Sequence, residues 1–269
     1  MRSAPPSFDL QAPEFDRRAG LPGVAAGDVA RSLLEIAGLD PRDLLLELGA
    51  GTGEIGAALA ASGVRYAGLD LSLGMLRVFR ARRAPGLLVQ ADAERPWPVR
   101  AGAARAVFSS RAAHLMDAGA LVEETLRAVH PAGAVFVLGR VRHDPEGLRT
   151  ALRRRMRHLL AERGLEGRSG ESAREALLEA FTARGGELLP PQAAARWQSG
   201  ESAAAALASW RSKPGLAGLS LAPALKHEVL DHLEDWARNA FADLETTREA
   251  AESYELTAVR LPPASTETA

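Results

Sequence analysis

The alternation of short apolar runs with helical patterns constrains the fold of this chain more than any other feature. Five runs have the length and composition of strands buried in a sheet, at 43–48, 65–71, 86–92, 104–110 and 133–141. Segments with apolar residues at helical spacing precede or separate most of them, beginning with residues 27–39. This alternation is typical of a mostly parallel sheet with helices on both faces. We therefore predict an α/β fold.

The pattern changes after residue 141. Helices are predicted at 144–164, 172–186, 201–211 and 222–244, and strands at 193–198 and 253–261. Ser172 and Glu175 have the spacing of a capping box, which predicts that the second of these helices starts at Ser172. The chain is thus expected to comprise an N-terminal arm (1–26), a core (27–141), a helical cap with terminal strands that complete the same domain (142–262), and a disordered tail (263–269).

Composition excludes several classes of function. The chain has no cysteine, so disulfides and thiolate chemistry are ruled out, and its six histidines lack the spacing of a metal site. We predict that it binds no metal. A net charge of −1 gives no reason to expect nucleic acid or an anionic membrane as a partner. No signal peptide or membrane-spanning run is apparent, so a cytoplasmic location is expected.

The segment LELGAGTGEIG, residues 46–56, has two overlapping glycine patterns. Gly49, Gly51 and Gly53 form G-x-G-x-G, and Gly56 extends the last two into the G-x-G-x-x-G of dinucleotide sites. Such a loop between a buried strand and a helix lets the backbone approach a ligand closely. A tight turn without a ligand is the alternative, but it does not require three alternating glycines, which cost conformational entropy. We interpret Gly56 as the tolerance of the helix for small residues.

Three carboxylates near the predicted strand ends help to identify the ligand. Asp70 ends the second strand, where both NAD and S-adenosylmethionine sites place an acid for the ribose hydroxyls, although an acid is also favourable beside a helix N-terminus. Glu47 would repel a pyrophosphate and suits a cationic ammonium or sulfonium. Asp92 ends the third strand, where a carboxylate can accept the adenine amino hydrogen. The chain also lacks a Tyr-x-x-x-Lys pair, so these features favour S-adenosylmethionine over NAD(P).

Five sequence blocks occur in a characteristic order: LLLELGAGTGEIGAALAASG, YAGLDLSLGML, LLVQADAERPWP, AVFSSRAAHLM and LRAVHPAGAVFVLGRV. With them the chain resembles class I S-adenosylmethionine-dependent methyltransferases of the bacterial small-molecule group, over residues 8–141. The resemblance implies a Rossmann-like, seven-stranded, mostly parallel sheet with an antiparallel strand near the carboxyl end and a helical cap over the carboxyl edge. It also implies an enzyme that moves the methyl group of S-adenosylmethionine to an O, N or C atom of a small molecule.

The resemblance assigns cofactor-binding roles to several residues. The methionine part would be surrounded by Glu47, Gly49, Ala50, Gly51 and Gly53. The adenosine part would be contacted by Asp70 at the ribose, Leu71 and Met75 against the ring, and Ala91, Asp92 and Ala93 at the adenine edge. The transferable methyl would lie beside Ser109 and Ser110. The chain departs from the family in having Phe15-Asp16 where relatives often have Tyr-Asp, and Ala104-Arg105-Ala106-Val107 where they often have Phe-Asp-x-Val.

Catalysis is less well specified. A sulfonium methyl is already activated, so in-line positioning can suffice, and a general base is needed only if the nucleophile must lose a proton. His114, after the fourth strand, is the candidate base, although a locally hydrogen-bonded helix residue explains it equally well. Arg111 is a candidate clamp for a substrate carboxylate or phosphate, or simply an exposed arginine. The rivals are a non-catalytic S-adenosylmethionine-binding protein and an NAD(P)-dependent oxidoreductase. The sequence leaves the acceptor, pathway and oligomeric state unspecified.

Two features after residue 141 permit more than one interpretation. Arg149, Arg153 and Arg157 recur every four residues, and we interpret them as a solvated basic face rather than a site for an acidic substrate or RNA. Trp197 and Trp210 suit either an acceptor pocket or core packing.

Overall fold

The computed structural model describes residues 9, 12, 15, 16, 20–166, 170–213 and 215–263. The chain divides into two compact units. The first comprises Met1–Arg140, Glu171–Ala195 and Tyr254–Ala269, and the second comprises Val141–Gly170 and Arg196–Ser253. Much of the predicted arm, and residues 264–269 of the predicted tail, lie outside the described residues. The predicted domain boundaries stay a prediction.

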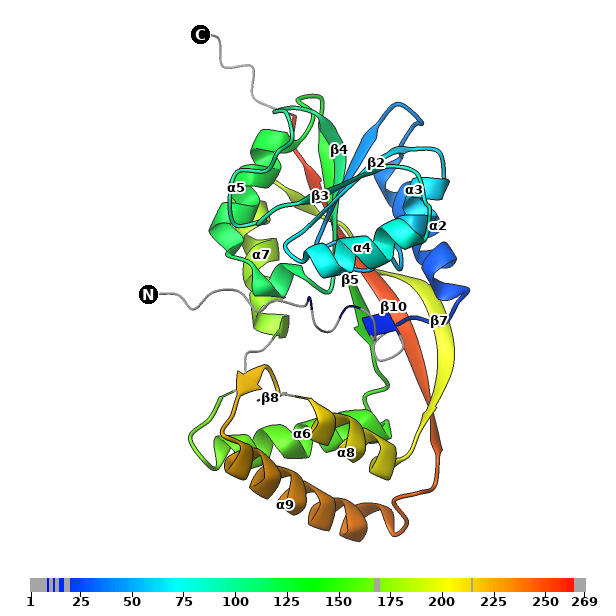
Figure 1. Ribbon diagram of the computed structural model, residues 1–269. Helices are drawn as coiled ribbons and strands as arrows, with labels where there is room; N and C mark the ends of the chain where they lie inside the picture. The colour runs from blue at the N-terminus through cyan, green and yellow to red at the C-terminus, as the bar shows by residue number, and fades with distance from the viewer. Residues whose placement is uncertain are drawn as a thin grey trace. The chain divides into compact units, whose positions relative to one another are not determined.

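An eight-stranded sheet organises the first unit (Figure 1). Its order is β3-β2-β1-β4-β5-β10-β6, and β7 also pairs with β10. The strands are β1 (Leu44–Leu48), β2 (Arg65–Asp70), β3 (Leu87–Gln90), β4 (Ala104–Ser110), β5 (Ala134–Arg142), β6 (Glu187–Leu188), β7 (Gln192–Glu201) and β10 (Arg248–Leu261). Strands β1 to β5 pair in parallel, and β6 is antiparallel to β10. The predicted mostly parallel α/β fold is confirmed.

The sheet has eight strands rather than the predicted seven because its edge is interrupted. Pro190 and Pro191 separate β6 from β7, and proline has no backbone N–H with which to continue a ladder. The pairing with β10 nevertheless continues beside them, since Leu189 N donates to Ala258 O at 2.8 Å. The two-residue strand β6 carries no alternating pattern of its own and was therefore not predicted.

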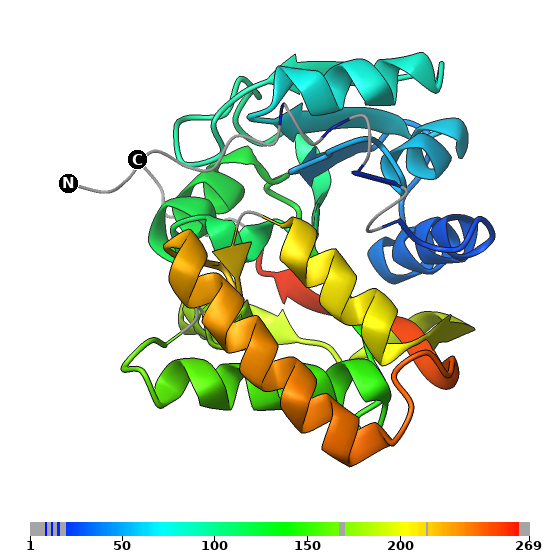
Figure 2. The same cartoon turned by 60° about the horizontal axis from the view of Figure 1, so that its bottom comes forward.

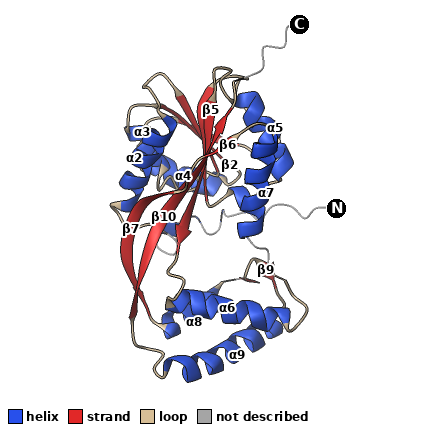
Figure 3. Cartoon of the chain, turned by 180° about the vertical axis from the view of Figure 1, so that it is seen from behind, coloured by secondary structure: helices blue, strands red, loops and turns tan. Residues whose placement is uncertain are grey.

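Helices cover both faces of this sheet, with α2 and α3 on one side and α5 and α7 on the other (Figure 3). In the described part of the first unit the α-helices are α2 (Ala25–Ala37), α3 (Gly56–Ala61), α4 (Leu73–Ala81), α5 (Ala118–Ala128) and α7 (Gly170–Ala183). Gly38 ends α2 in the left-handed conformation, as expected for a C-terminal glycine. Ser72 caps α4 by accepting from Met75 N at 3.1 Å, which confirms the predicted cap.

The predicted start of α7 is wrong. The helix already includes Gly170 and Glu171, so Ser172 lies inside its first turn and cannot be the residue that caps it. A serine followed by a glutamate three residues later occurs within helices as well as at their starts, which is why the capping-box pattern placed the boundary too late in the chain.

The second unit contains three helices that pack together, α6 (Leu148–Ala161), α8 (Ala203–Ser212) and α9 (Pro223–Phe241), with a small hairpin of β8 (Gly215–Leu216) and β9 (Leu219–Ser220) (Figure 2). Its core includes Leu152 and Met156 of α6, as the apolar stripe predicts, together with Trp210 of α8 and Leu233 of α9. No helix in the described part of the chain, α9 included, is long and apolar enough to cross a membrane.

Lys226 of α9 has a structural role. It is buried, and its ammonium donates to the carbonyl of Arg211 at 2.6 Å and to that of Lys213, at the end of α8. Carbonyls at a helix C-terminus lack intrahelical partners, and a cation there is favourable. Lys226→Met keeps the apolar stem but leaves both carbonyls unsatisfied. We expect it to lower the free energy of unfolding in urea by about 1–2 kcal/mol.

The matched control for Lys226 is Arg154→Met. It removes one positive charge from an exposed position of α6 in the same unit, and we expect a change within about 0.5 kcal/mol. Equal losses in the two variants would show that the carbonyl contacts of Lys226 contribute nothing specific.

Candidate functional site

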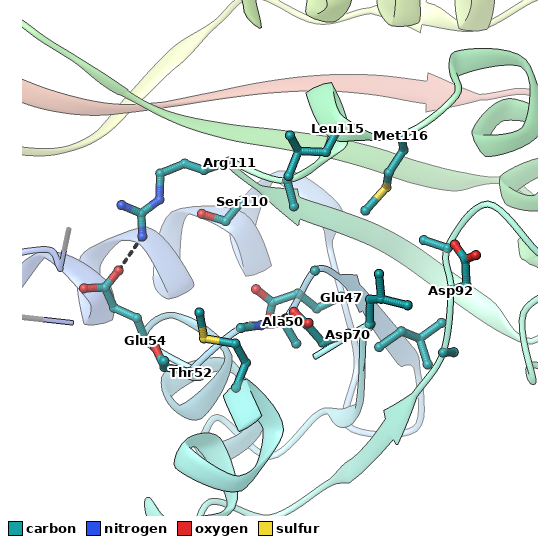
Figure 4. A pocket seen from close by; sticks show the side chains of 18 of the residues that line it. Glu47, Ala50, Thr52, Glu54, Asp70, Asp92, Ser110, Arg111, Leu115 and Met116 are labelled. Carbon is teal, nitrogen blue, oxygen red and sulfur yellow. Dashed lines mark hydrogen bonds and ion pairs between the residues drawn. The ribbon is translucent and has the colours of Figure 1, made fainter. Parts of the chain in front are cut away.

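A pocket in the first unit opens where β1, β2 and β4 end (Figure 4). Ligands of open α/β sheets bind at this edge, where the strand order reverses between β1 and β4. The pocket is lined by most of the predicted site residues: Glu47, Gly49, Ala50, Gly51, Asp70, Leu71, Met75, Ala91, Asp92, Ala93, Ser110 and Arg111. Residues from four separate sequence blocks therefore meet in one cavity.

Three predicted residues are not part of this lining. Gly53 is buried with φ 76°, and a Cβ atom there would lie 2.2 Å from the Phe79 ring, so its role is to pack the loop onto α4. Ser109 is fully buried, and its hydroxyl donates to Leu48 O at 3.0 Å, which ties β4 to β1. His114 is exposed on a short 3-10 helix, Ala113–Leu115. The position of these residues in the sequence does not show whether they face the cavity.

Several residues of the lining were not predicted as site residues: Phe15, Thr52, Glu54, Ile55, Leu69, Glu94, Ala112, Leu115 and Met116. Most are apolar and carry no chemical signature. Glu54 could have been predicted as a site residue, because it is an acid directly after the last glycine of the loop. The Leu115-Met116 pair directly follows His114 at the end of a quoted block, but only the histidine offered obvious chemistry.

Asp70 is held in place by the backbone around it. One carboxylate oxygen accepts from Gly51 N and the other from Ser72 N, both at 2.8 Å. These bonds fix the carboxylate between the glycine loop and the start of α4. Burial raises its pKa, and the two backbone bonds oppose that rise. An ionised carboxylate has more acceptor positions than two bonds use, so it can also accept from hydroxyl groups of a ligand.

Glu47 is almost completely buried at the base of the pocket, where the Tyr66 hydroxyl donates to it at 2.6 Å. Burial raises the pKa of its carboxyl to about 8, while the Tyr66 bond opposes the rise. Glu47 is therefore largely protonated at neutral pH in the free protein. The negative charge predicted for Glu47 is therefore wrong for the free protein. The sequence shows where Glu47 lies in the chain but not that it is buried.

Gly56 has a definite role, which corrects its interpretation as incidental. A Cβ atom there would lie 2.4 Å from the Tyr66 hydroxyl and 2.6 Å from a Glu47 oxygen. The position must be glycine for the Glu47–Tyr66 pair to fit behind α3. The G-x-G-x-x-G pattern thus reflects packing around a buried acid.

Gly56→Ala tests this packing. We expect it to lower the free energy of unfolding by about 1–2 kcal/mol, because the added methyl displaces the buried pair. The control is Gly27→Ala in α2, where a Cβ atom meets nothing within 4 Å; there we expect a gain of about 0.5–1 kcal/mol. Urea denaturation measures both. A gain at Gly56 similar to that at Gly27 would contradict the account.

Glu54 and Arg111 form an ion pair in the pocket wall, with 2.7 Å between Nη2 and Oε2 (Figure 4). Glu54 also accepts from Leu21 N. Burial raises the pKa of Glu54, and the charge of Arg111 opposes the rise. Arg111 has φ 57°, a conformation that non-glycine residues seldom adopt, so the turn after β4 holds it under strain. Such strain is typical of functional loops.

The two ends of the pocket differ in chemistry. In Figure 4, Asp92 and the Arg111–Glu54 pair lie on opposite sides of Asp70. The Asp92 end includes Ala91 and Ala93, and Asp92 itself accepts from Glu94 N at 2.9 Å. Near the loop, a Cβ atom on Gly51 would meet nothing closer than 3.9 Å, which leaves space for a ligand against the backbone. The cavity thus has one end lined by two alanines and Asp92, the Asp70 carboxylate between the ends, and the Arg111–Glu54 ion pair at the other end.

Part of the N-terminal arm belongs to this site. Phe15 lines the pocket, and the Asp16 carboxylate accepts from the Thr52 hydroxyl and from Arg82. Arg82 in turn donates from Nε to Thr52 O at 2.7 Å. These contacts anchor the Phe15-Asp16 pair to the glycine loop, although the family resemblance leads one to expect a tyrosine hydroxyl there.

Comparison with known proteins agrees with the motifs. Residues 46–137 match the family model described as "Methyltransferase domain". A comparison with curated proteins finds no match.

Solved structures share the fold at low sequence identity. A candidate type II methyltransferase from Anaeromyxobacter dehalogenans is 20% identical, with a TM-score of 0.57 over 86% of this chain and 97% of that one. A candidate methyltransferase from Bacillus halodurans is 18% identical, with a TM-score of 0.55 over 87% and 98%. The [4+2]-cyclase SpnF is 17% identical, with a TM-score of 0.55 over 95% and 94%.

These similarities establish the fold. One of the similar structures is a [4+2]-cyclase, so the fold alone does not specify a reaction. The family model is the more specific finding, because it covers the glycine loop, Asp70, Asp92 and the end of β4. The predicted resemblance, enzyme class and cofactor are confirmed. Residues 46–137 are the methyltransferase domain of a class I S-adenosylmethionine-dependent methyltransferase.

Proposed function

We propose that this protein transfers the methyl group of S-adenosylmethionine to an O, N or C atom of a small-molecule acceptor. The observation that carries the proposal is the position of Asp70, whose carboxylate is fixed by two backbone N–H groups in the middle of the pocket. A carboxylate held this way suits a pair of ribose hydroxyls. The apolar side chains of Leu71 and Met75 beside it suit an adenine ring.

The residues present fit the cofactor along the whole pocket. Asp92, with Ala91 and Ala93, would contact the adenine edge, and the open backbone at Gly49–Gly51 would accommodate the methionine part. The cofactor, when bound, supplies a methyl group activated by its sulfonium. Glu47 offers a carboxyl at the base of the pocket that can ionise beside a cation.

The chain offers two residues for the acceptor. Partial desolvation of the imidazole lowers the pKa of His114, which favours the neutral form that can accept a proton. It is exposed and outside the lining, but Ala112 and Leu115 beside it contribute to the pocket. Arg111 lines the pocket and would clamp an anionic group only by exchanging its bond with Glu54. Both assignments stay predictions.

A methyl-acceptor screen tests the function directly. Pools of small metabolites are incubated with the protein and S-adenosylmethionine, and S-adenosylhomocysteine release is measured. We expect release that depends on one pool and is lost in His114→Ala if that residue is the base. A matched control is His158→Ala, an exposed histidine on α6. Binding of S-adenosylhomocysteine without turnover on any pool would favour the rival, a non-catalytic binding protein.

The remaining predictions concern partners and location. We expect no nucleic acid or membrane partner and a cytoplasmic location. Among the described residues, no group of three or more His, Cys, Asp or Glu side chains is placed to hold a metal ion. An NAD(P)-dependent oxidoreductase is the weaker rival, and the match to the methyltransferase domain weighs against it.

A further inference from the structure

Two hydroxyl groups meet in the pocket wall of the first unit. Ser110, the last residue of β4, lines the pocket, and its Oγ lies 2.5 Å from the hydroxyl of Tyr254 in β10. Tyr254 is fully buried and has no part in the function proposed above. In Figure 4, Ser110 lies close to Arg111 and far from Asp92. The two hydroxyls are therefore at the end of the pocket formed by the Arg111–Glu54 ion pair.

One glycine makes room for this contact. Gly139 of β5 pairs with Ser110 in the sheet, and β5 lies between β4 and β10. A Cβ atom on Gly139 would lie 2.3 Å from the Tyr254 hydroxyl and 2.7 Å from its ring. Any side chain at this position would therefore displace the phenol from Ser110. The glycine lets Tyr254 reach a pocket residue that is two strands away.

The burial of Tyr254 decides which hydroxyl is the donor. Among the described residues, Ser110 is the only hydrogen-bond partner of the phenol. A buried O–H group without an acceptor costs about 1–3 kcal/mol, so the phenol hydrogen points to Ser110. Burial also raises the pKa of Tyr254, although the bond with Ser110 opposes the rise, so the phenol keeps its hydrogen at neutral pH. Tyr254 is therefore the donor and Ser110 the acceptor.

Ser110 consequently keeps its own hydroxyl hydrogen for a ligand. A serine hydroxyl has one hydrogen and two acceptor positions, and the phenol uses one of those positions. No other described residue bonds to the Ser110 side chain, which borders the cavity. A hydroxyl that accepts a hydrogen bond is also a better donor, because hydrogen bonds in a chain polarise one another. The pair thus supplies one oriented O–H donor to the pocket.

The surroundings of this donor favour a carboxylate as its partner. Hydrogen bonds to an ionised oxygen are stronger than those between neutral groups. The Arg111–Glu54 pair beside Ser110 carries both charges, and an ionised amino acid group, which also carries both, is complementary to it. The methionine part of the cofactor is such a group. With the adenine beside Asp92 and the ribose beside Asp70, it extends toward this end of the pocket (Figure 4).

We propose that the Ser110 hydroxyl donates to a carboxylate of the bound ligand, and that Tyr254 is a positioning residue that holds this hydroxyl. The carboxylate belongs to the methionine part of the cofactor or to the methyl acceptor, and the proposal rests on the function proposed above. Because Tyr254 acts only through Ser110, its hydroxyl contributes to binding only while that of Ser110 is present.

Carbon-13 NMR of the tyrosine rings identifies the carboxylate. The full-length chain has two tyrosines, so Tyr254→Phe identifies the Tyr254 signal. We expect this signal to shift with S-adenosylhomocysteine but not with methylthioadenosine, which lacks the amino acid group. A shift that appears only when acetate is added assigns the donor to a carboxylate of the acceptor. A signal that moves with neither carboxylate, or that responds unchanged in Ser110→Ala, would overturn the proposal.

Calorimetry measures the strength of the contact. We expect Ser110→Ala to weaken the responding carboxylate ligand about threefold to tenfold, the effect of one charge-assisted hydrogen bond, and to leave methylthioadenosine within about twofold. The matched control is Ser109→Ala, which removes the neighbouring hydroxyl, bonded to Leu48 O outside the lining. We expect its affinities to stay within about twofold of the natural protein. Equal weakening in the two serine variants would contradict the assignment.

A double variant tests the positioning role of Tyr254. Tyr254→Phe should weaken the same ligand about threefold, because the Ser110 hydroxyl then turns freely, but should have no effect in a Ser110→Ala background. Equal weakening in both backgrounds would show a merely structural role and overturn the proposal. The acetate titration needs no cofactor. If S-adenosylhomocysteine does not bind, the proposed function fails while acetate still tests this contact.

Discussion

Asp70→Ala is expected to weaken the binding of S-adenosylhomocysteine about 100-fold, as the loss of two hydrogen bonds to a charged group would. The carboxylate is the only acidic group in the pocket fixed by backbone donors from both the glycine loop and the start of α4, among the described residues. Removing it takes away the acceptor for ribose hydroxyls and leaves Gly51 N and Ser72 N without their partner. Titration calorimetry measures the change.

A control for stability is needed, because Asp70 also supports its loop. Asp117→Ala removes a carboxylate that accepts from Ala120 N at the start of α5, outside the pocket lining. We expect it to lower the free energy of unfolding by about 1 kcal/mol and to leave the affinity unchanged. Unchanged affinity in a folded Asp70→Ala variant would mean that the ribose binds elsewhere.

The affinity for S-adenosylmethionine is expected to rise with pH up to about pH 8. In the free protein the Glu47 carboxyl has a pKa of about 8, and a cationic ligand binds better to its ionised form. Well below this pKa each binding event must release the proton, so the affinity should change by about tenfold per pH unit there and level off near pH 8, or by about 50-fold between pH 6 and pH 8. Calorimetry in buffers of different ionisation enthalpy measures the proton released.

Glu47→Gln is the control for this pH dependence. The amide keeps an acceptor for the Tyr66 hydroxyl but cannot ionise, so we expect a flat affinity across the same range. The natural protein should also lose stability as pH rises from about 4.5 to 8, because its folded state holds a proton there that the unfolded chain releases. A pH slope of binding that persists in Glu47→Gln would assign the proton to another group.

Much of the fold follows from local sequence patterns. The buried strand predicted at 43–48 and found at Leu44–Leu48, the glycine loop, and Asp70 at the end of β2 each have a distinct local cause, either the length of an apolar run or a residue type at a strand end. The cap at Ser72 follows in the same way. Parallel strands bring their carboxyl ends to one edge, which is why most predicted site residues meet in the pocket.

What was missed depends on contacts between distant segments. The burial of Glu47 requires Tyr66 from β2 and the absence of a side chain at Gly56. The Glu54–Arg111 pair joins residues 57 positions apart. Neither pairing produces a periodic pattern in the sequence. Even a correct list of the acids at strand ends therefore could not show which acid is protonated or which forms an ion pair. Burial and partner choice are properties of packing.

Calorimetric titration with S-adenosylhomocysteine tests the central claim, that the pocket around Asp70 binds the methyl-donor cofactor. We predict a saturable heat with one site per chain, competition by S-adenosylmethionine, and no competition by NAD. No heat at high micromolar ligand in a folded sample, or displacement by NAD, would contradict the account.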